Sequence, residues 1–180
     1  MSLDSVRAWL SAHAPDLPII ESPESTATVE LAAQALGVEP GRIAKTLAIR
    51  VAERIVLVVA RGDARLDNAK SKAAFHGRPR MLGPEETFAI TGHPVGGVCP
   101  FGLAQPLPVY CDVSLKAFDF VYPAAGSLNT SVKVTPRRLG ELVATGGGRH
   151  LQAARLASLE RRQTLHPPLI EPLKFSREPT

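Results

Sequence analysis

The sequence predicts an α/β or α+β fold in which helices flank a mixed sheet. Two observations support this: apolar, β-branched runs alternate with segments of helical periodicity, and two such runs follow each other closely enough to form a hairpin. The length of 180 residues allows one domain with a tail. The apolar fraction of 44% and the charged fraction of 21% are typical of soluble globular chains, so the chain can bury a core without disulfide bonds.

The spacing of apolar residues and the positions of glycine and proline define the individual elements. In chain order we expect a helix over 2–13, a strand over 17–22, a helix over 25–37, strands over 43–51 and 54–62, helices over 67–77 and 83–92, strands over 107–113, 120–124 and 131–135, and a helix that begins at Pro136. Little more than Ala52 and Glu53 separates the fourth and fifth of these elements, which predicts the hairpin. Residues 55–60 are apolar on both faces, so this strand should be central and covered.

Residue types at the helix ends support the assignments. Serine, threonine and aspartate accept hydrogen bonds from the free amides of a first turn, and glycine ends a helix in a left-handed conformation. The helix over 25–37 is therefore expected to be capped by Ser25 or Thr26 and closed by Gly37. The helix that follows the hairpin is expected to start at Asp67 and to stop at Gly77.

The character of the chain changes after the T-G-G-G run at 145–148. We assign residues 1–148 to the domain and residues 149–180 to a basic, proline-rich C-terminal extension. Residues 149–165 have the spacing of an amphipathic helix, whereas residues 166–180 are too rich in proline to pack. The extension is therefore expected to be partly disordered.

The formal net charge of +4 conceals an uneven distribution. Residues 42–80 hold ten basic residues against three acidic ones, whereas residues 1–41 hold one basic residue against six acidic ones. Such asymmetry suggests one face that meets an anion such as nucleic acid. A solvated helix and loop surface is the alternative, and charge alone favours this alternative.

Composition also excludes several classes of protein. No apolar run approaches the roughly 18 residues of a membrane span, and the N-terminus lacks the apolar core of a secretory signal. Cys99 and Cys111 alone form neither a disulfide framework nor a four-cysteine zinc site, and the histidines have no metal-ligand spacing. We therefore expect a cytoplasmic protein without a membrane segment, a metal or a cofactor.

The densest unusual segment is G-H-P-V-G-G-V-C-P-F-G at 92–102. Glycines let backbone amides approach a ligand, and successive amides can bind an anion or serve an ester carbonyl as an oxyanion hole. The spacing fits neither a Walker A loop nor a dinucleotide-binding fingerprint. A plain connection that needs positive φ is an equally weighted alternative.

Lys45 is the second candidate, because it begins a strand whose same-face neighbours Leu47, Ile49 and Val51 are apolar. A lysine there either snorkels to water at the sheet edge or is held in a pocket where its charge is used. Snorkelling is the more common case for a single lysine.

A third candidate pairs two side chains of the glycine-rich segment. Cys99 as a thiol nucleophile with His93 as its base would make a hydrolase. No neighbouring residue is expected to orient the histidine, and a loop cysteine before proline is more often a small packing residue. The chain contains no G-x-S-x-G motif, and we identify no hydrolytic triad.

Five segments together resemble one family. They are AKTLAIRV at 44–51, LDNAKSKAAF at 66–75, TGHPVGGVCPFG at 91–102, VYCDVSLKAFDFVYPAAG at 109–126 and SVKVTPRRL at 131–139. Their order and separation resemble the YbaK/EbsC-type aminoacyl-tRNA deacylases, a family that includes the editing insertion domain of bacterial prolyl-tRNA synthetases. The resemblance covers roughly residues 1–145 and is closer to freestanding editors of small residues than to the cysteinyl-specific type.

The resemblance implies a fold, a reaction and a site. The implied YbaK-like fold is α/β (α+β), with a mixed, mainly antiparallel sheet or partial barrel flanked by helices. The implied reaction is trans-editing: hydrolysis of the ester bond of mischarged aminoacyl-tRNA that carries a small amino acid of the Ala, Ser and Thr class, or Cys. The family's lysine falls on Lys45, which holds the substrate. Its glycine-rich loop falls on Gly96, Gly97 and Val98, whose amides bind the ester carbonyl.

No side-chain nucleophile and no cofactor are implied, because the 2′-OH of the terminal ribose or a held water assists the hydrolysis. Such an editor is useful because a synthetase gains only about 1–3 kcal/mol per methylene and therefore mischarges small amino acids. The basic residues of 42–80 would contact tRNA phosphates. The implied partners are the 3′ end of mischarged tRNA and, as a second candidate, an aminoacyl-tRNA synthetase, with the chain as a monomer or weak homodimer.

Further positions border the pocket in the relatives, namely Thr26, Thr46, Gly126 and Ser127. The Lys45 ammonium is expected to face the 96–98 amides across an open pocket. Two alternative functions stay open: a non-catalytic module that binds a tRNA end or a synthetase, and a thiol hydrolase that uses Cys99 and His93.

Overall fold

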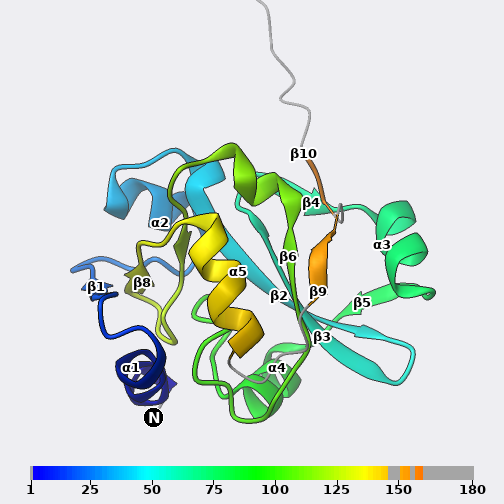
Figure 1. Ribbon diagram of the computed structural model, residues 1–180, viewed down its shortest axis with the longest axis horizontal. Helices are drawn as coiled ribbons and strands as arrows, with labels where there is room; N and C mark the ends of the chain where they lie inside the picture. Colours follow the sequence, from blue (N-terminus) through cyan, green and yellow to red (C-terminus); the bar gives the residue numbers. More distant parts are fainter. Residues whose placement is uncertain (1, 146–150, 155–156, 160–180) are drawn as a thin grey trace, which may run out of the picture.

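The computed structural model describes residues 2–145, 151–154 and 157–159 (Figure 1). Its helices and strands follow in chain order: α1 (Ser2–His13), β1 (Ile19–Glu21), α2 (Val29–Leu36), β2 (Ile43–Val51), β3 (Arg54–Arg61), β4 (Ala64–Leu66), α3 (Asn68–Phe75), β5 (Pro79–Met81), α4 (Pro84–Thr91), β6 (Val109–Asp112), β7 (Tyr122–Pro123), β8 (Thr130–Val132), α5 (Pro136–Thr145), β9 (Leu151–Ala154) and β10 (Ala157–Leu159). Two 3₁₀ turns, Pro40–Arg42 and Val113–Ala117, precede β2 and follow β6.

Most strands join one sheet in the order β5–β2–β3–β6–β9, and β7 also pairs with β2. β2 runs antiparallel to β3 and β5, whereas β3 with β6, β6 with β9 and β2 with β7 are parallel pairs. Two short antiparallel pairs, β1 with β8 and β4 with β10, lie outside this sheet. The prediction of a mixed sheet flanked by helices is confirmed.

The predicted hairpin forms the centre of the sheet. Val51 of β2 pairs with Arg54 of β3, and Ala52 in the turn adopts a φ of 52°. A positive φ suits a two-residue hairpin turn because it matches the twist of the strands. β3 lies between β2 and β6 with residues 56–60 buried, so the prediction of a central, covered strand is confirmed.

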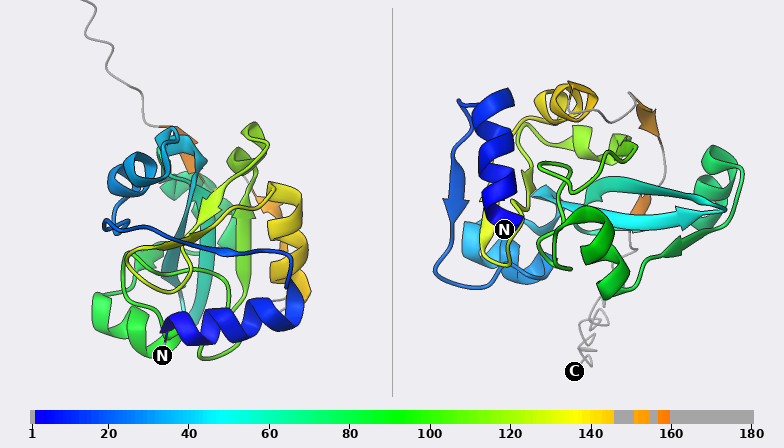
Figure 2. Two further views of the ribbon diagram at one scale, coloured as in Figure 1. Left: turned by 90° about the vertical axis from the view of Figure 1, so that its left-hand side faces the viewer. Right: turned by 90° about the horizontal axis from the view of Figure 1, so that it is seen from below.

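The two faces of β2 pack against different parts of the chain. Ala44 and Ala48 belong to the main core, which also contains Phe101 and residues of α1 and α5. Ile49 lies on the other face and packs with Phe75 of α3. Figures 1 and 2 accordingly show α1 and α3 at opposite ends of the molecule. Because side chains alternate along a strand, the even-numbered residues of β2 share the face of α1 and α5.

The start of α2 differs from the prediction. Thr28, rather than Ser25 or Thr26, caps this helix, and its hydroxyl oxygen accepts a hydrogen bond from the amide of Leu31 at 3.2 Å. Thr26 instead donates its hydroxyl to the carbonyl oxygen of Leu128 at 3.2 Å. A contact between distant segments therefore takes the side chain that the local sequence offers to the helix.

The other predicted helix ends agree more closely with the structure. Gly37 closes α2 with a φ of 64°, and the Asp67 side chain caps α3. α3 ends at Phe75, and its C-cap residue His76 adopts a left-handed φ of 56° one residue before the predicted Gly77. The left-handed region is costly for most residues but is visited by histidine more often than average.

The C-terminal segment also departs from expectation. β9 pairs with β6 through Tyr110 and Asp112, and β10 pairs with β4 over residues 64–66. The helix predicted over 149–165 is therefore wrong at the positions that the structure describes. The edges of β6 and β4 offer backbone hydrogen bonds, which outweigh a weak local helix preference. The remaining residues of the extension, including those expected to be disordered, lie outside the described residues.

Candidate active site

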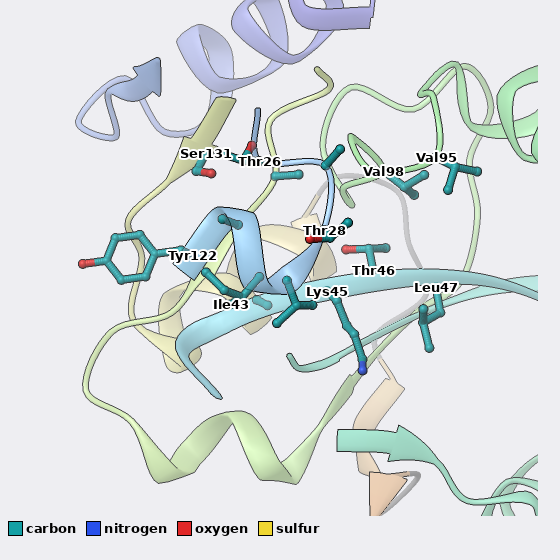
Figure 3. A pocket seen from close by; sticks show the side chains of 16 residues that line it. Thr26, Thr28, Ile43, Lys45, Thr46, Leu47, Val95, Val98, Tyr122 and Ser131 are labelled. Atoms are coloured by element: carbon teal, nitrogen blue, oxygen red, sulfur yellow. The ribbon is translucent and has the colours of Figure 1, made fainter. Parts of the chain in front are cut away.

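A small open cavity lies between the start of α2, the edge of β2 and the glycine-rich loop (Figure 3). Its volume is about 180 Å³. Lys45 is the single charged residue among the described residues that line it. The lining residues are Thr26, Ala27, Thr28, Val29, Ala32, Ile43, Ala44, Lys45, Thr46, Leu47, Val95, Gly96, Val98, Tyr122, Ala124 and Ser131. This mostly apolar lining and modest volume suit a small organic group.

The glycine-rich loop packs so closely that a side chain at either of two glycines would crowd neighbouring backbone atoms. Gly96 has a φ of 92°, and a Cβ built on it would lie 2.9 Å from the carbonyl oxygen of Ala27. A Cβ on Gly97 would lie 3.0 Å from backbone atoms of Ser127. The loop therefore needs both positive φ and close backbone approach, as the plain-connection alternative supposed, while it also forms a wall of the cavity.

The amides of the loop differ in their availability. The Gly97 amide donates to the carbonyl oxygen of Pro94 at 2.9 Å and closes a turn. Within the described ranges, the amides of Gly96 and Val98 have no hydrogen-bond partner. Two of the three predicted amides therefore have no partner among the described residues, and both belong to residues that line the cavity.

The Lys45 side chain lies on the face of β2 opposite the glycine-rich loop. Its ammonium donates hydrogen bonds to the carbonyl oxygens of Gly62, at 2.8 Å, and Ala64. Figure 3 shows the Nζ directed away from Val95 and Val98. The expected arrangement, with the ammonium facing the loop amides, is thus not observed. Lys45 borders the cavity, and carbonyl oxygens beyond the end of β3 hold its charge.

Thr26 and Thr46 both line the cavity, but only the Thr26 hydroxyl has a hydrogen-bond partner among the described residues. The Thr26 hydroxyl is bonded to Leu128, and Thr26 therefore ties the segment before α2 to the turn after β7. The Thr46 hydroxyl is buried and has no hydrogen-bond partner among the described residues. Figure 3 shows Thr46 on the side of β2 that faces Thr28 and Val98.

Gly126 and Ser127 support the loop from behind rather than line the cavity. The Gly126 amide donates to the carbonyl oxygen of Gly97 at 3.1 Å. The Ser127 hydroxyl bonds to the side chains of Asn129, at 2.9 Å, and Thr130, at 2.8 Å. The structure therefore gathers Lys45, Thr26, Thr46, Gly96 and Val98 around the cavity and places Gly97, Gly126 and Ser127 outside its lining.

His93 and Cys99 lie 3.7 Å apart (Nε2 to Sγ), and both side chains are fully buried. Burial raises the pKa of the Cys99 thiol to about 12 and lowers the pKa of His93. A buried thiol that stays protonated at neutral pH is a poor nucleophile.

The expectation that no residue orients His93 is wrong. Its Nδ1 lies 2.6 Å from the Ser2 hydroxyl, and its Nε2 lies 2.8 Å from the carbonyl oxygen of Phe101. The Ser2 hydroxyl also donates to the carbonyl oxygen of Gly126 at 2.5 Å. This network holds the glycine-rich loop against α1, so His93 and Cys99 are packing residues of the loop.

Six of the ten basic residues of 42–80 fall into two groups, one paired with carboxylates and one without an ion pair among the described residues. Three arginines of the first group pair with carboxylates, two of which lie outside 42–80 and offset part of the positive charge of this segment. The pairs are Arg42–Asp119, Arg50–Glu86 and Arg61–Asp63. Lys72, Arg78 and Arg80 are exposed on and between α3 and β5 and form no ion pair with any described residue. These three side chains are the cations best placed to meet an anionic partner.

Sequence reasoning missed several lining residues. Tyr122, Ile43 and Ser131 come from three different strands, and the topology alone brings them to one cavity. They carry no motif of their own, so no local signal could have found them.

The sequence also predicts that the protein has neither a metal site nor a membrane-spanning segment. Across residues 2–145 and the two short C-terminal strands, no group of three or more His, Cys, Asp or Glu residues is arranged to hold a metal ion. None of the described helices has both the length and the apolar character needed to cross a membrane.

Comparison with known proteins relates this geometry to a family. The aminoacyl-tRNA editing domain matches residues 23–142, which include the loop and Lys45. YwhH of Bacillus subtilis is 48% identical over 142 residues, covering 78% of this chain and 90% of YwhH. EbsC of Enterococcus faecalis, named for a proposed Cys-tRNA(Pro)/Cys-tRNA(Cys) deacylase activity, is 29% identical over 119 residues, covering 64% of this chain and 72% of EbsC.

Two more comparisons link the chain to prolyl-tRNA synthetase. The proline–tRNA ligase of Thermotoga maritima is 40% identical over 77 residues, which are 42% of this chain and 13% of the ligase. The crystal structure of a proposed trans-editing enzyme for prolyl-tRNA synthetase matches with a TM-score of 0.76 at 35% identity, covering 87% of this chain and 97% of that one. This chain belongs to the aminoacyl-tRNA editing domain family.

Proposed function

We propose that this chain hydrolyses the ester bond of mischarged aminoacyl-tRNA that carries a small amino acid. The observation that carries the proposal is the small, mostly apolar cavity with two unpartnered amides, Gly96 and Val98, in its wall. Its modest volume favours side chains of the Ala, Ser and Thr class, with Cys as a further candidate.

The loop amides stabilise the charge that develops in the reaction. Water adds to the ester carbonyl carbon, and the oxygen that becomes negative accepts hydrogen bonds from Gly96 and Val98. The free 2′-OH of the terminal ribose, or a second held water, takes the proton of the attacking water and passes one to the leaving ribose oxygen. The carbon–oxygen bond to the ribose then breaks, and the amino acid leaves as its free acid. No nucleophilic side chain is needed.

Lys45 holds the substrate in this proposal. Its ammonium is fixed beside the cavity by the carbonyl oxygens of Gly62 and Ala64, where it attracts a phosphate of the tRNA 3′ end. The exposed Lys72, Arg78 and Arg80 extend the positive surface toward the rest of the acceptor stem.

The partner is mischarged tRNA, and prolyl-tRNA synthetase is the synthetase whose errors the chain corrects. The sequence match to a segment of proline–tRNA ligase and the structural match to a proposed trans-editing enzyme support this assignment. A synthetase pocket discriminates weakly against smaller amino acids, so a second site that admits only small side chains complements it.

A panel of mischarged tRNAs tests the proposal. Purified protein is incubated with tRNA(Pro) that carries Ala, Ser, Thr, Cys or Pro, and the release of amino acid is measured. We expect hydrolysis of at least one small aminoacyl ester and protection of Pro-tRNA(Pro). Lys45→Ala should lose at least tenfold in kcat with the fold intact, whereas Lys116→Ala, which removes an exposed lysine outside the cavity lining, should keep the wild-type kcat. Salt-dependent tRNA binding without any turnover would identify a binding module instead.

A further inference from the structure

The edge of β2 that faces away from β3 has a gap. β7 pairs with this edge at Ile43 and Ala44, and β5 pairs with it from Ile49 to Val51. The Ala48 carbonyl oxygen also accepts a hydrogen bond from the Leu82 amide at 3.0 Å. Between these contacts, residues 45–47 have no strand partner on this edge among the described residues.

Only one residue in the gap directs its backbone groups outward. Along a strand, the N–H and C=O groups of alternate residues point to the same edge. The outward pairing of Ala44 and Ala48 therefore places the N–H and C=O of Thr46 on the open edge as well. No described residue bonds to either group. The gap is a slot one residue wide in the edge of the sheet.

The Thr46 side chain adds a third unsatisfied group at the same place. Its hydroxyl is buried without a hydrogen-bond partner in the part of the chain that the structure describes. Burying a hydroxyl in this way is unfavourable unless a ligand completes its hydrogen bonding. Even-numbered residues of β2 share the face of the glycine-rich loop, and Thr46, Gly96 and Val98 line one cavity.

We propose that Thr46 binds the α-amino group of the aminoacyl ester, which occupies the slot as a single strand residue would. This inference rests on the proposed function. The amino group donates to the Thr46 carbonyl and hydroxyl oxygens, and the ester carbonyl is left to the amides of Gly96 and Val98. No carboxylate lines the described cavity, and the carbonyl and hydroxyl oxygens of Thr46 are acceptors that no described residue occupies. Recognition through the α-amino group works for any side chain small enough to enter.

N-acetylation of the substrate tests this assignment, because it blocks the amino group and leaves the ester in place. The rates kcat/KM for Ala-tRNA(Pro) and N-acetyl-Ala-tRNA(Pro) are measured for the wild type, Thr46→Val and Thr46→Ser. We expect the wild type to prefer the free amine by at least about tenfold. Thr46→Val, which has the same shape without the hydroxyl, should lower this preference by about tenfold, whereas Thr46→Ser should retain it.

The outcomes separate the inference from the function on which it rests. Equal rates on the two substrates in the wild type, or an unchanged preference in Thr46→Val, would overturn the role of Thr46 while deacylation stands. Absence of turnover by the wild type on every mischarged tRNA would overturn the proposed function itself. Thermal unfolding controls for folding: removal of an unpartnered buried hydroxyl should leave the Tm of Thr46→Val equal to or above that of the wild type.

Discussion

Substitution of Gly96 by alanine should both destabilise the protein and disable the cavity. The new Cβ would lie 2.9 Å from the Ala27 carbonyl oxygen and 3.0 Å from Cδ2 of Leu128. The Leu128 side chain is 43% exposed and can move, but the backbone before α2 cannot move without shifting the helix. Alanine at a φ of 92° costs about 1–3 kcal/mol in backbone strain, and forced contact costs a similar amount. We therefore expect a loss of about 2–6 kcal/mol in the free energy of unfolding.

Gly140 supplies the matched control. It lies inside α5, and a Cβ there would meet no atom within 4 Å. Gly140→Ala should therefore stabilise the protein by about 0.5–1 kcal/mol, because alanine favours a helix over glycine. Urea unfolding followed by circular dichroism measures both variants against the wild type.

Activity gives a second measure for Gly96→Ala. In urea-free buffer at a temperature where the variant is still folded, displacement of the amides should lower kcat by about 10²–10³, the usual effect of losing an oxyanion donor. Gly140→Ala should keep wild-type kcat. A Gly96→Ala protein that unfolds at the same urea concentration as the wild type would refute the steric reasoning.

Three further predictions concern groups away from the reacting ester. Cys99→Ala should leave deacylation unchanged, and the native Cys99 thiol should resist iodoacetamide because burial raises its pKa to about 12; loss of activity in the variant would revive the thiol mechanism. Combined substitution of Lys72, Arg78 and Arg80 by alanine should raise KM for tRNA and reduce its salt dependence, with kcat kept within about twofold; an unchanged salt slope would place the tRNA elsewhere. Burial lowers the pKa of His93 below its unfolded value of about 6.5. As the pH falls, the His93 side chain is therefore protonated in the unfolded chain before it is protonated in the folded protein. The free energy of unfolding should then decrease as the pH drops below about 6.5. Unfolding of His93→Gln against wild type between pH 5 and 8 checks this, since the variant should lose that part of the pH dependence.

Local signals made most of the secondary structure predictable from the sequence. The hairpin of β2 and β3 and the end of α2 at Gly37 follow from neighbouring residues alone. The N-terminal cap of α2 could not be predicted from neighbouring residues. The carbonyl oxygen of Leu128, about a hundred residues away, accepts a hydrogen bond from the Thr26 hydroxyl, and Thr28 caps the helix instead. β9 and β10 were missed for a similar reason, because they form on strand edges that lie far away in the sequence.

The residues of the candidate site were partly predictable from the sequence, but their orientation was not. The glycine-rich loop and Lys45 were identified from residue types, and both border the cavity. Alternation along β2 puts Lys45 and Thr46 on opposite faces, yet the sequence does not say which face meets the loop. That depends on the packing of Ala44 and Ala48 against Phe101 in the tertiary structure. The family resemblance names Thr46 as a pocket residue, but only the structure shows that its side chain lies on the face of the loop.

The hydrogen bond from Ser2 to Gly126 has a consequence for the order of events during folding. It joins residues 124 positions apart, and the Gly126 amide in turn holds the carbonyl oxygen of Gly97, which lies between the cavity-lining residues Gly96 and Val98. Contacts of such long range form late, because the chain must first close a large loop. A nascent chain that has not been synthesised as far as Gly126 therefore cannot have a complete cavity. Catalytic activity should be among the last properties that the protein acquires during its synthesis.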